Sequence, residues 1–231
     1  MEIHGIQKMT LLDYPEKVAC TIFTARCNFR CPFCHNASLV THVDAAAAIS
    51  EEEVFSFLAK RQGILDGVCI TGGEPLLQPD IEEFIRKVKE LGYQVKLDTN
   101  GSNVLRLRRL VEQGLVDYVA MDIKNAPDKY GMTIGIEEYD MSNIFSECGF
   151  SDVWGMFPMN FAPRLCGSSI KREDFCCYRA WIKGGKTILS AELCRFRRFD
   201  LPRNEGVYKR DYGTGTGDCT EKYSECEVKG V

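Results

Sequence analysis

Four short apolar segments, each followed by a loop and then by a helical pattern, constrain the fold of this chain most. They span residues 18–23, 67–70, 93–97 and 118–121. Between them apolar residues recur at helical spacing, as in the helix for which Ser50 is the predicted N-cap. This alternation of strand, loop and helix is typical of a parallel sheet with helices outside it. We therefore expect an α/β fold.

An unusual loop follows each predicted strand. The four loops are CNFRCPFCHN (27–36), TGGEP (71–75), DTNG (98–101) and DIK (122–124). In parallel β/α folds such loops gather at the carboxyl ends of the strands, where ligands bind. Motifs that are far apart in sequence are therefore expected to form one site.

Composition excludes several classes of protein. The net charge of the 231 residues is −4, which gives no reason to expect nucleic-acid binding or a basic membrane patch. The N-terminal segment is too polar for a signal peptide, and no run reaches the ~18 apolar residues of a membrane span. We expect a cytoplasmic protein with no nucleic-acid or membrane partner. In such a protein, twelve cysteines favour metal or redox chemistry over disulfides.

Three cysteines, Cys27, Cys31 and Cys34, fall within eight residues. Three thiolates can bind three irons of a [4Fe–4S] cluster and leave the fourth iron open to an external ligand. Zinc is an alternative, although a structural zinc site normally needs a fourth Cys or His. His35 is adjacent to Cys34, and neighbouring side chains rarely point at one metal. A third alternative is a set of inert, buried thiols.

The TGGEP loop can bring a ligand close to the backbone. Gly72 and Gly73 allow conformations that other residues resist, and Glu74 offers a carboxylate. The ammonium group of an amino acid would suit this carboxylate. The alternative is an ordinary turn with a solvated glutamate.

These motifs together resemble the radical S-adenosylmethionine (SAM) superfamily. The segment GIQKMTLLDYPEKVACTIFTARCNFRCPFCHN resembles the activating enzymes of glycyl-radical enzymes, above all those of anaerobic ribonucleoside-triphosphate reductase and of pyruvate formate-lyase. The resemblance covers about residues 3–140. It implies a partial (β/α) barrel, open on one side, with a radical SAM core in residues 1–143. Residues 144–231 would be the C-terminal part of the barrel.

The resemblance also implies a cofactor site. Cys27, Cys31 and Cys34 would hold a [4Fe–4S] cluster whose fourth iron binds the amino and carboxylate groups of SAM. The remaining implied contacts are with SAM: Phe33 and His35 near the adenine, Gly72, Gly73 and Glu74 near the methionyl ammonium, Asp98, Thr99 and Asp122 near the ligand, and Lys124 near the carboxylate or ribose. In some members the aspartate and threonine positions bind a monovalent cation.

The implied activity is reductive cleavage of SAM to a 5′-deoxyadenosyl radical, which generates a glycyl radical on a partner enzyme. Anaerobic ribonucleoside-triphosphate reductase is the expected partner, with a pyruvate formate-lyase-like enzyme second. A flavodoxin or ferredoxin-type protein would donate electrons, and no side chain need act as an acid or base. The alternatives are a radical SAM enzyme for a small molecule, such as a 7-carboxy-7-deazaguanine synthase, and an inactive Cys₃ metal-binding protein.

Two features depart from the family pattern. Arg26 stands where the family usually has glycine, so a positive φ there would strain the cluster loop. Residues 144–231 are irregular and match the family poorly. Read one base out of phase, codons for NFAPRLCGSS also encode EFRTTVVREF, and codons for ELCRFRRFDLP also encode SFVDSGDLI. We interpret parts of residues 144–228 as frame-shifted coding sequence, with a divergent family tail as the alternative.

Overall fold

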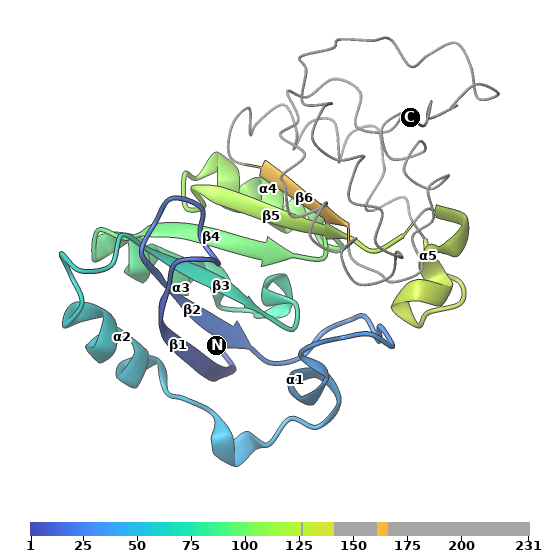
Figure 1. Ribbon diagram of the computed structural model, residues 1–231, viewed down its shortest axis with the longest axis horizontal. Helices are drawn as coiled ribbons and strands as arrows, with labels where there is room; N and C mark the ends of the chain where they lie inside the picture. Colours follow the sequence, from blue (N-terminus) through green and yellow to red (C-terminus); the bar gives the residue numbers. More distant parts are fainter. Residues whose placement is uncertain (126, 141–160, 166–231) are drawn as a thin grey trace, which may run out of the picture.

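One six-stranded sheet organises the computed structural model, which describes residues 1–125, 127–140 and 161–165 (Figure 1). The strand order follows the sequence. The strands are β1 (Ile3–Thr10), β2 (Ala19–Thr24), β3 (Gly67–Gly72), β4 (Gln94–Thr99), β5 (Tyr118–Ile123) and β6 (Phe161–Leu165). β2 to β6 are parallel, which confirms the α/β prediction, and β1 pairs antiparallel with β2.

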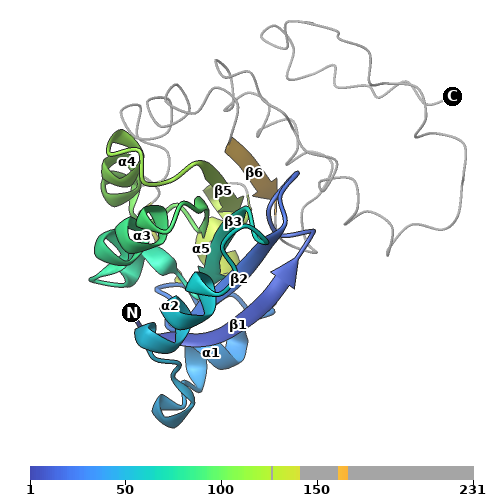
Figure 2. The same ribbon diagram turned by 90° about the vertical axis from the view of Figure 1, so that its left-hand side faces the viewer.

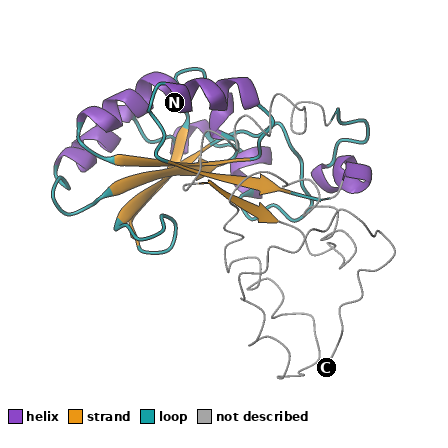
Figure 3. Cartoon of the chain, turned by 90° about the horizontal axis from the view of Figure 1, so that it is seen from above, coloured by secondary structure: helices purple, strands orange, loops and turns teal. Residues whose placement is uncertain are grey.

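Three helices cover one face of the sheet. α2 (Glu51–Ala59), α3 (Ile81–Glu90) and α4 (Val104–Glu112) lie on the same side of the strands (Figures 2 and 3). The predicted N-cap of α2 is confirmed, because Ser50 Oγ accepts a hydrogen bond from the Glu53 amide at 3.2 Å. The core lies between these helices and the sheet, where alternate strand residues such as Ile22 and Ile70 are fully buried.

Two helix predictions differ from the structure. Ile64 follows Val54, Phe57 and Leu58 at roughly helical spacing, so the sequence predicts it on the apolar stripe of α2, but it lies beyond the helix and is 56 % exposed. α2 ends at Ala59, and Gly63, with a φ of 76°, turns the chain away from the helix axis before Ile64. Asp80, with Glu83 three residues later, is the predicted N-cap of α3. Its side chain makes no capping hydrogen bond, because its carboxylate forms an ion pair with the amino group of Met1 instead.

The carboxyl ends of β2 to β5 carry the four predicted loops, so the motifs meet at one edge of the sheet. α1 (Ala37–Thr41) and α5 (Pro127–Ile134) also lie toward this edge (Figure 1). Among the described strands, β1 and β6 each have one neighbour, so this part of the barrel is open, as the resemblance implied.

Most of the predicted C-terminal region, 144–231, lies outside the described residues. Its interpretation as frame-shifted sequence therefore stays a prediction, as does the boundary at residue 143. The five residues of β6 extend the sheet beside β5. In the part of the chain that the structure describes, no helix is both long enough and apolar enough to span a membrane.

Candidate functional site

The cysteine loop leaves β2 at the carboxyl edge of the sheet. Cys27, Cys31 and Cys34 are partly buried and carry free thiols. The amide of Phe29 donates to Cys27 Sγ at 3.3 Å, and the amide of Cys34 donates to the Cys31 carbonyl at 3.1 Å. Within the described residues, no three Cys, His, Asp or Glu side chains are grouped closely enough to hold a metal ion. To bind a shared cluster, the three thiols would have to turn toward one another.

Burial favours the protonated form of two of these thiols, Cys27 and Cys31. It raises the pKa of Cys27 to about 11, against the opposing effect of the Phe29 amide hydrogen bond. Burial also raises the pKa of Cys31. Thiolate is the form that binds iron, so metal binding must displace the protons. The donor set fits a [4Fe–4S] cluster by its chemistry: three cysteine sulfur atoms on one loop, which would leave the fourth iron to an external ligand.

An aromatic cluster anchors the cysteine loop to α5. Phe29 is 2 % exposed, and its ring meets Tyr130 and Tyr139 edge-on, with centroids 6.3 and 5.3 Å away. The amide of Arg30 also donates to the Ile134 carbonyl at 2.7 Å. The loop is therefore fixed between two of its cysteines, even though its own sequence has no regular secondary structure.

Arg26 has a positive φ, the conformation that the sequence analysis identified as a source of strain in the cluster loop. Its φ is 69°, which confirms that this position favours glycine. The backbone is held on both sides: the Arg26 amide donates to the Leu39 carbonyl at 2.8 Å, and its carbonyl accepts from the Glu74 amide at 2.8 Å. The strained residue lies directly before Cys27. The hydrogen bond from the Glu74 amide to its carbonyl links the cysteine loop to the TGGEP loop.

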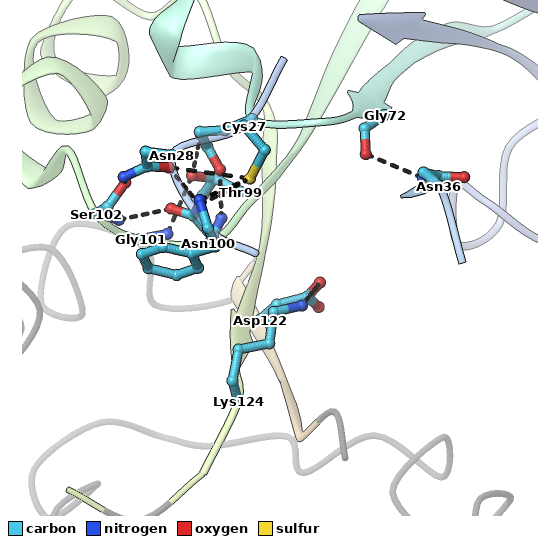
Figure 4. Close-up of polar contacts among 12 residues, drawn as sticks. Cys27, Asn28, Asn36, Gly72, Thr99, Asn100, Gly101, Ser102, Asp122 and Lys124 are labelled. Atoms are coloured by element: carbon cyan, nitrogen blue, oxygen red, sulfur yellow. Dashed lines mark hydrogen bonds and ion pairs between the residues drawn. The ribbon is translucent and has the colours of Figure 1, made fainter. Parts of the chain in front are cut away.

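The TGGEP loop is shaped by close backbone approach. A Cβ on Gly73 would overlap the Arg26 carbonyl oxygen, and Gly72 has a φ of 113°. The Gly72 carbonyl accepts a hydrogen bond from the side-chain amide of Asn36 at 3.0 Å, a contact visible in Figure 4. These glycines therefore serve the packing of the TGGEP loop against β2 and the cysteine loop, beyond any contact with a ligand.

Glu74 is fully buried and bonded to its own chain. Oε1 accepts from Thr99 Oγ1 at 2.7 Å and from the Leu76 amide at 3.1 Å, and Oε2 accepts from the Asn100 amide at 2.7 Å. Burial raises the pKa of Glu74 to about 7, with these hydrogen bonds acting in the opposite direction. The solvated-turn alternative is wrong, because the carboxylate is 0 % exposed.

Asn100 joins its own loop to the cysteine loop and to Glu74, and the sequence analysis did not single it out. Its side-chain amide donates to Asn28 Oδ1 at 2.9 Å and approaches Cys27 Sγ at 3.7 Å. Its side-chain oxygen accepts from the Ser102 amide at 2.9 Å. Figure 4 shows Cys27, Asn28 and Asn100 together. An amide residue directly after Asp98-Thr99, at the end of a buried strand, was the available signal.

Two lysine–aspartate ion pairs lie near the site, one on β4 and one at the carboxyl end of β5. Lys96 Nζ forms an ion pair with Asp98 Oδ1, and Lys124 Nζ lies 2.9 Å from Asp122 Oδ2. Figure 4 shows the Lys124–Asp122 pair set apart from the asparagine cluster. Lys96 was not singled out in the sequence, although a lysine in the middle of a buried strand is unusual.

The remaining predicted contacts lie on the cysteine loop. Phe33 is half-buried and His35 is exposed. Their expected place beside an adenine stays a prediction.

The segment that carries this site matches a known protein family. A model of the radical SAM superfamily matches residues 21–157, more than half of the chain. The chain belongs to the radical SAM superfamily. The cofactors of this superfamily are a [4Fe–4S] cluster and SAM, in agreement with the prediction from the cysteine spacing and the resemblance.

Three curated relatives each align with about half of this chain. A Methanocaldococcus jannaschii protein assigned as a glycyl-radical enzyme activating enzyme is 39 % identical over 132 residues, covering 55 % of this chain and 52 % of its own. The pyruvate formate-lyase-activating enzyme of Clostridium pasteurianum is 30 % identical over 131 residues, covering 54 % and 53 %. A Thermococcus kodakarensis protein assigned as GTP 3′,8-cyclase is 30 % identical over 115 residues, covering 49 % and 37 %. The chain spans about half the length of the first two of these curated relatives.

Solved radical SAM structures share the fold. Streptococcus suis SuiB bound to its precursor peptide SuiA superimposes with a TM-score of 0.54 at 14 % identity, over 70 % of this chain and 35 % of SuiB. SuiB bound to SAM gives a TM-score of 0.50 at 15 % identity, over 68 % and 35 %. At such identities the likeness supports the (β/α) barrel architecture alone.

Proposed function

We propose that this protein is a radical SAM activating enzyme that generates a glycyl radical on a partner enzyme. Cys27, Cys31 and Cys34 would hold the [4Fe–4S] cluster, and the loops at the same edge of the sheet would hold SAM beside it. When bound, the reduced cluster would supply the one electron for cleavage of SAM, with methionine and 5′-deoxyadenosine as products and a glycine Cα of the partner as the source of the hydrogen atom.

The observation that carries this proposal is the network that joins the three loops. Glu74 accepts from Thr99 and from the Asn100 amide, and Asn100 reaches Asn28 and Cys27 on the cysteine loop. Buried hydrogen bonds of this kind fix the relative positions of loops from β2, β3 and β4. A cluster and its co-substrate would need such fixed loops, because a reaction between two bound groups depends on how they are held relative to each other.

The chain's own residues position and shield the reaction. Phe29, Tyr130 and Tyr139 form an apolar wall beside the cysteine loop. An apolar wall excludes water, and exclusion of water protects a reactive radical from side reactions. No side chain is required to add or remove a proton, since both steps move an electron or a hydrogen atom.

The partner is proposed from the relatives. The archaeal relative is named for activation of a glycyl-radical enzyme and the clostridial relative for activation of pyruvate formate-lyase. Within that class we assign anaerobic ribonucleoside-triphosphate reductase as the partner, on the sequence GIQKMTLLDYPEKVACTIFTARCNFRCPFCHN, and a flavodoxin or ferredoxin-type protein as the electron donor.

The test is a glycyl-radical signal in electron paramagnetic resonance. The reconstituted protein, SAM and a reductant are mixed anaerobically with the reductase or, separately, with pyruvate formate-lyase. We expect the glycyl doublet on the reductase, its loss in Cys31→Ala, and its retention in Cys20→Ala, which removes a buried thiol in β2 away from the loop. A signal on pyruvate formate-lyase alone would contradict the reductase as the partner. It would still support the function of an activating enzyme for a glycyl-radical enzyme.

A second function is favoured by one comparison. The Thermococcus relative assigned as GTP 3′,8-cyclase is 30 % identical over 115 residues, so the core also resembles enzymes that act on small molecules. Under that function, 5′-deoxyadenosine would form in the presence of GTP with no protein radical on either partner.

A further inference from the structure

Lys96 is a buried cation in the middle of the sheet. Its side chain is 1 % exposed, and in the register of the strands it lies beside Cys69 on β3 and Tyr118 on β5. Its Nζ is 3.6 Å from Cys69 Sγ and 5.9 Å from the centre of the Tyr118 ring. Burial of a lysine costs free energy unless the charge is paired, and here the pairing partner is Asp98.

Asp98 is one of the two carboxylates that the family resemblance assigned to a monovalent cation, and Asp122 is the other. In this structure each already faces an ammonium group: Lys96 on Asp98, and Lys124 on Asp122 at 2.9 Å. A further cation would bring a third positive charge to two carboxylates. It would also have to displace Lys96, whose buried stem holds the charge in place. The residues present do not fit a bound monovalent cation.

We propose that the ammonium group of Lys96 replaces the monovalent cation, so that this protein binds SAM without any requirement for sodium or potassium. The inference rests on the proposed function, since it concerns the same SAM site. A lysine ammonium is a compact unit charge with three donors, which can satisfy a carboxylate as a small cation does. Because it is covalently part of β4, it is present at every salt concentration.

The test measures SAM affinity of the reconstituted holoenzyme by equilibrium dialysis. One buffer contains potassium chloride and the other choline chloride, at equal ionic strength of about 0.1 M so that general screening is the same. For the native chain we expect the same Kd in both buffers, within about twofold. For Lys96→Met we expect a Kd about tenfold higher in choline, with recovery when potassium is added. Such a gain of potassium dependence is not expected from mere loss of stability.

Lys89→Met is the matched control. Lys89 is also paired with an aspartate, Asp117, at 2.7 and 2.8 Å, but this pair precedes β5 at the opposite end of the strands. This variant should bind SAM equally in both buffers. If Lys96→Met does not fold, the native chain still decides: a potassium requirement there would overturn the inference and leave the proposed function standing. Absence of SAM binding by the native chain in both buffers would overturn both.

Discussion

Arg26 is the residue at which local backbone preference and site geometry conflict most directly. A left-handed conformation costs an ordinary residue about 1–2 kcal/mol, and glycine almost nothing. Arg26 is held in this conformation, at a φ of 69°, because its amide and carbonyl form hydrogen bonds with Leu39 and Glu74. Its guanidinium pairs with Glu2, which raises the pKa of Arg26 and lowers that of Glu2. The exposed pair compensates little, since solvent screens it.

Arg26→Gly should therefore stabilise the apoprotein. We expect an unfolding free energy higher by about 1 kcal/mol in urea titrations, together with more iron bound per chain after reconstitution. Glu16→Gly is the control, because Glu16 also has a positive φ, 62°, outside the cysteine loop. It should stabilise to a similar degree without any change in iron content. An unchanged iron content in Arg26→Gly would show that the strain does not limit cluster loading.

The Cys27 thiol should react as a weakly acidic group. Because burial raises its pKa to about 11, its thiolate fraction stays small at neutral pH. Alkylation of Cys27 in the folded apoprotein, followed by peptide mass spectrometry, should accelerate about tenfold per pH unit up to about pH 10. In the urea-unfolded chain the same rate should level off near about pH 8.5. A folded-state rate that also levels there would contradict the burial argument.

Among the elements, the TGGEP loop and the end of α3 need glycine for two different reasons. Gly73 has no room for a Cβ against the Arg26 carbonyl, whereas Gly92, at the end of α3, has a φ of 87° and open space around it. Steric overlap with backbone cannot be relieved by rotating a side chain. The two positions therefore separate crowding from backbone strain.

Gly73→Ala should destabilise the protein more than Gly92→Ala. We expect a loss of at least about 2 kcal/mol for the first and about 1 kcal/mol for the second, measured by urea unfolding. Gly73→Ala should also reduce iron binding, because the displaced Arg26 carbonyl immediately precedes Cys27. Equal losses in the two variants would mean that the loops do not constrain each other.

The sequence predicted those elements whose signal is local. Strands β2 to β5 and the N-cap Ser50 followed from apolar periodicity and capping chemistry, and both depend on neighbours along the chain. β1 was missed because its residues show no clear alternation of buried and exposed positions; three consecutive residues, Gln7 to Met9, are exposed. The roles of Lys96 and Asn100 were missed for another reason. Each depends on partners from other strands, and spacing alone cannot show such contacts.

For the whole molecule, the family relationship is carried by the first part of the chain. The archaeal relative aligns over 55 % of it, and the family model ends at residue 157. The interpretation that parts of residues 144–228 are frame-shifted makes a direct prediction. Resequencing the source DNA should find base insertions or deletions whose correction restores segments close to EFRTTVV and FVDSGDLI. An unbroken reading frame at high coverage would leave a divergent tail.

The most direct test of the central claim is the formation of 5′-deoxyadenosine. The protein is reconstituted anaerobically with iron and sulfide, reduced, and incubated with SAM, and the nucleoside is measured by chromatography. We predict formation by the native chain and by Cys20→Ala, and none by Cys27→Ala, Cys31→Ala or Cys34→Ala. Equal formation by the loop variants, or none by a native chain that carries its full cluster, would contradict radical cleavage of SAM at this site.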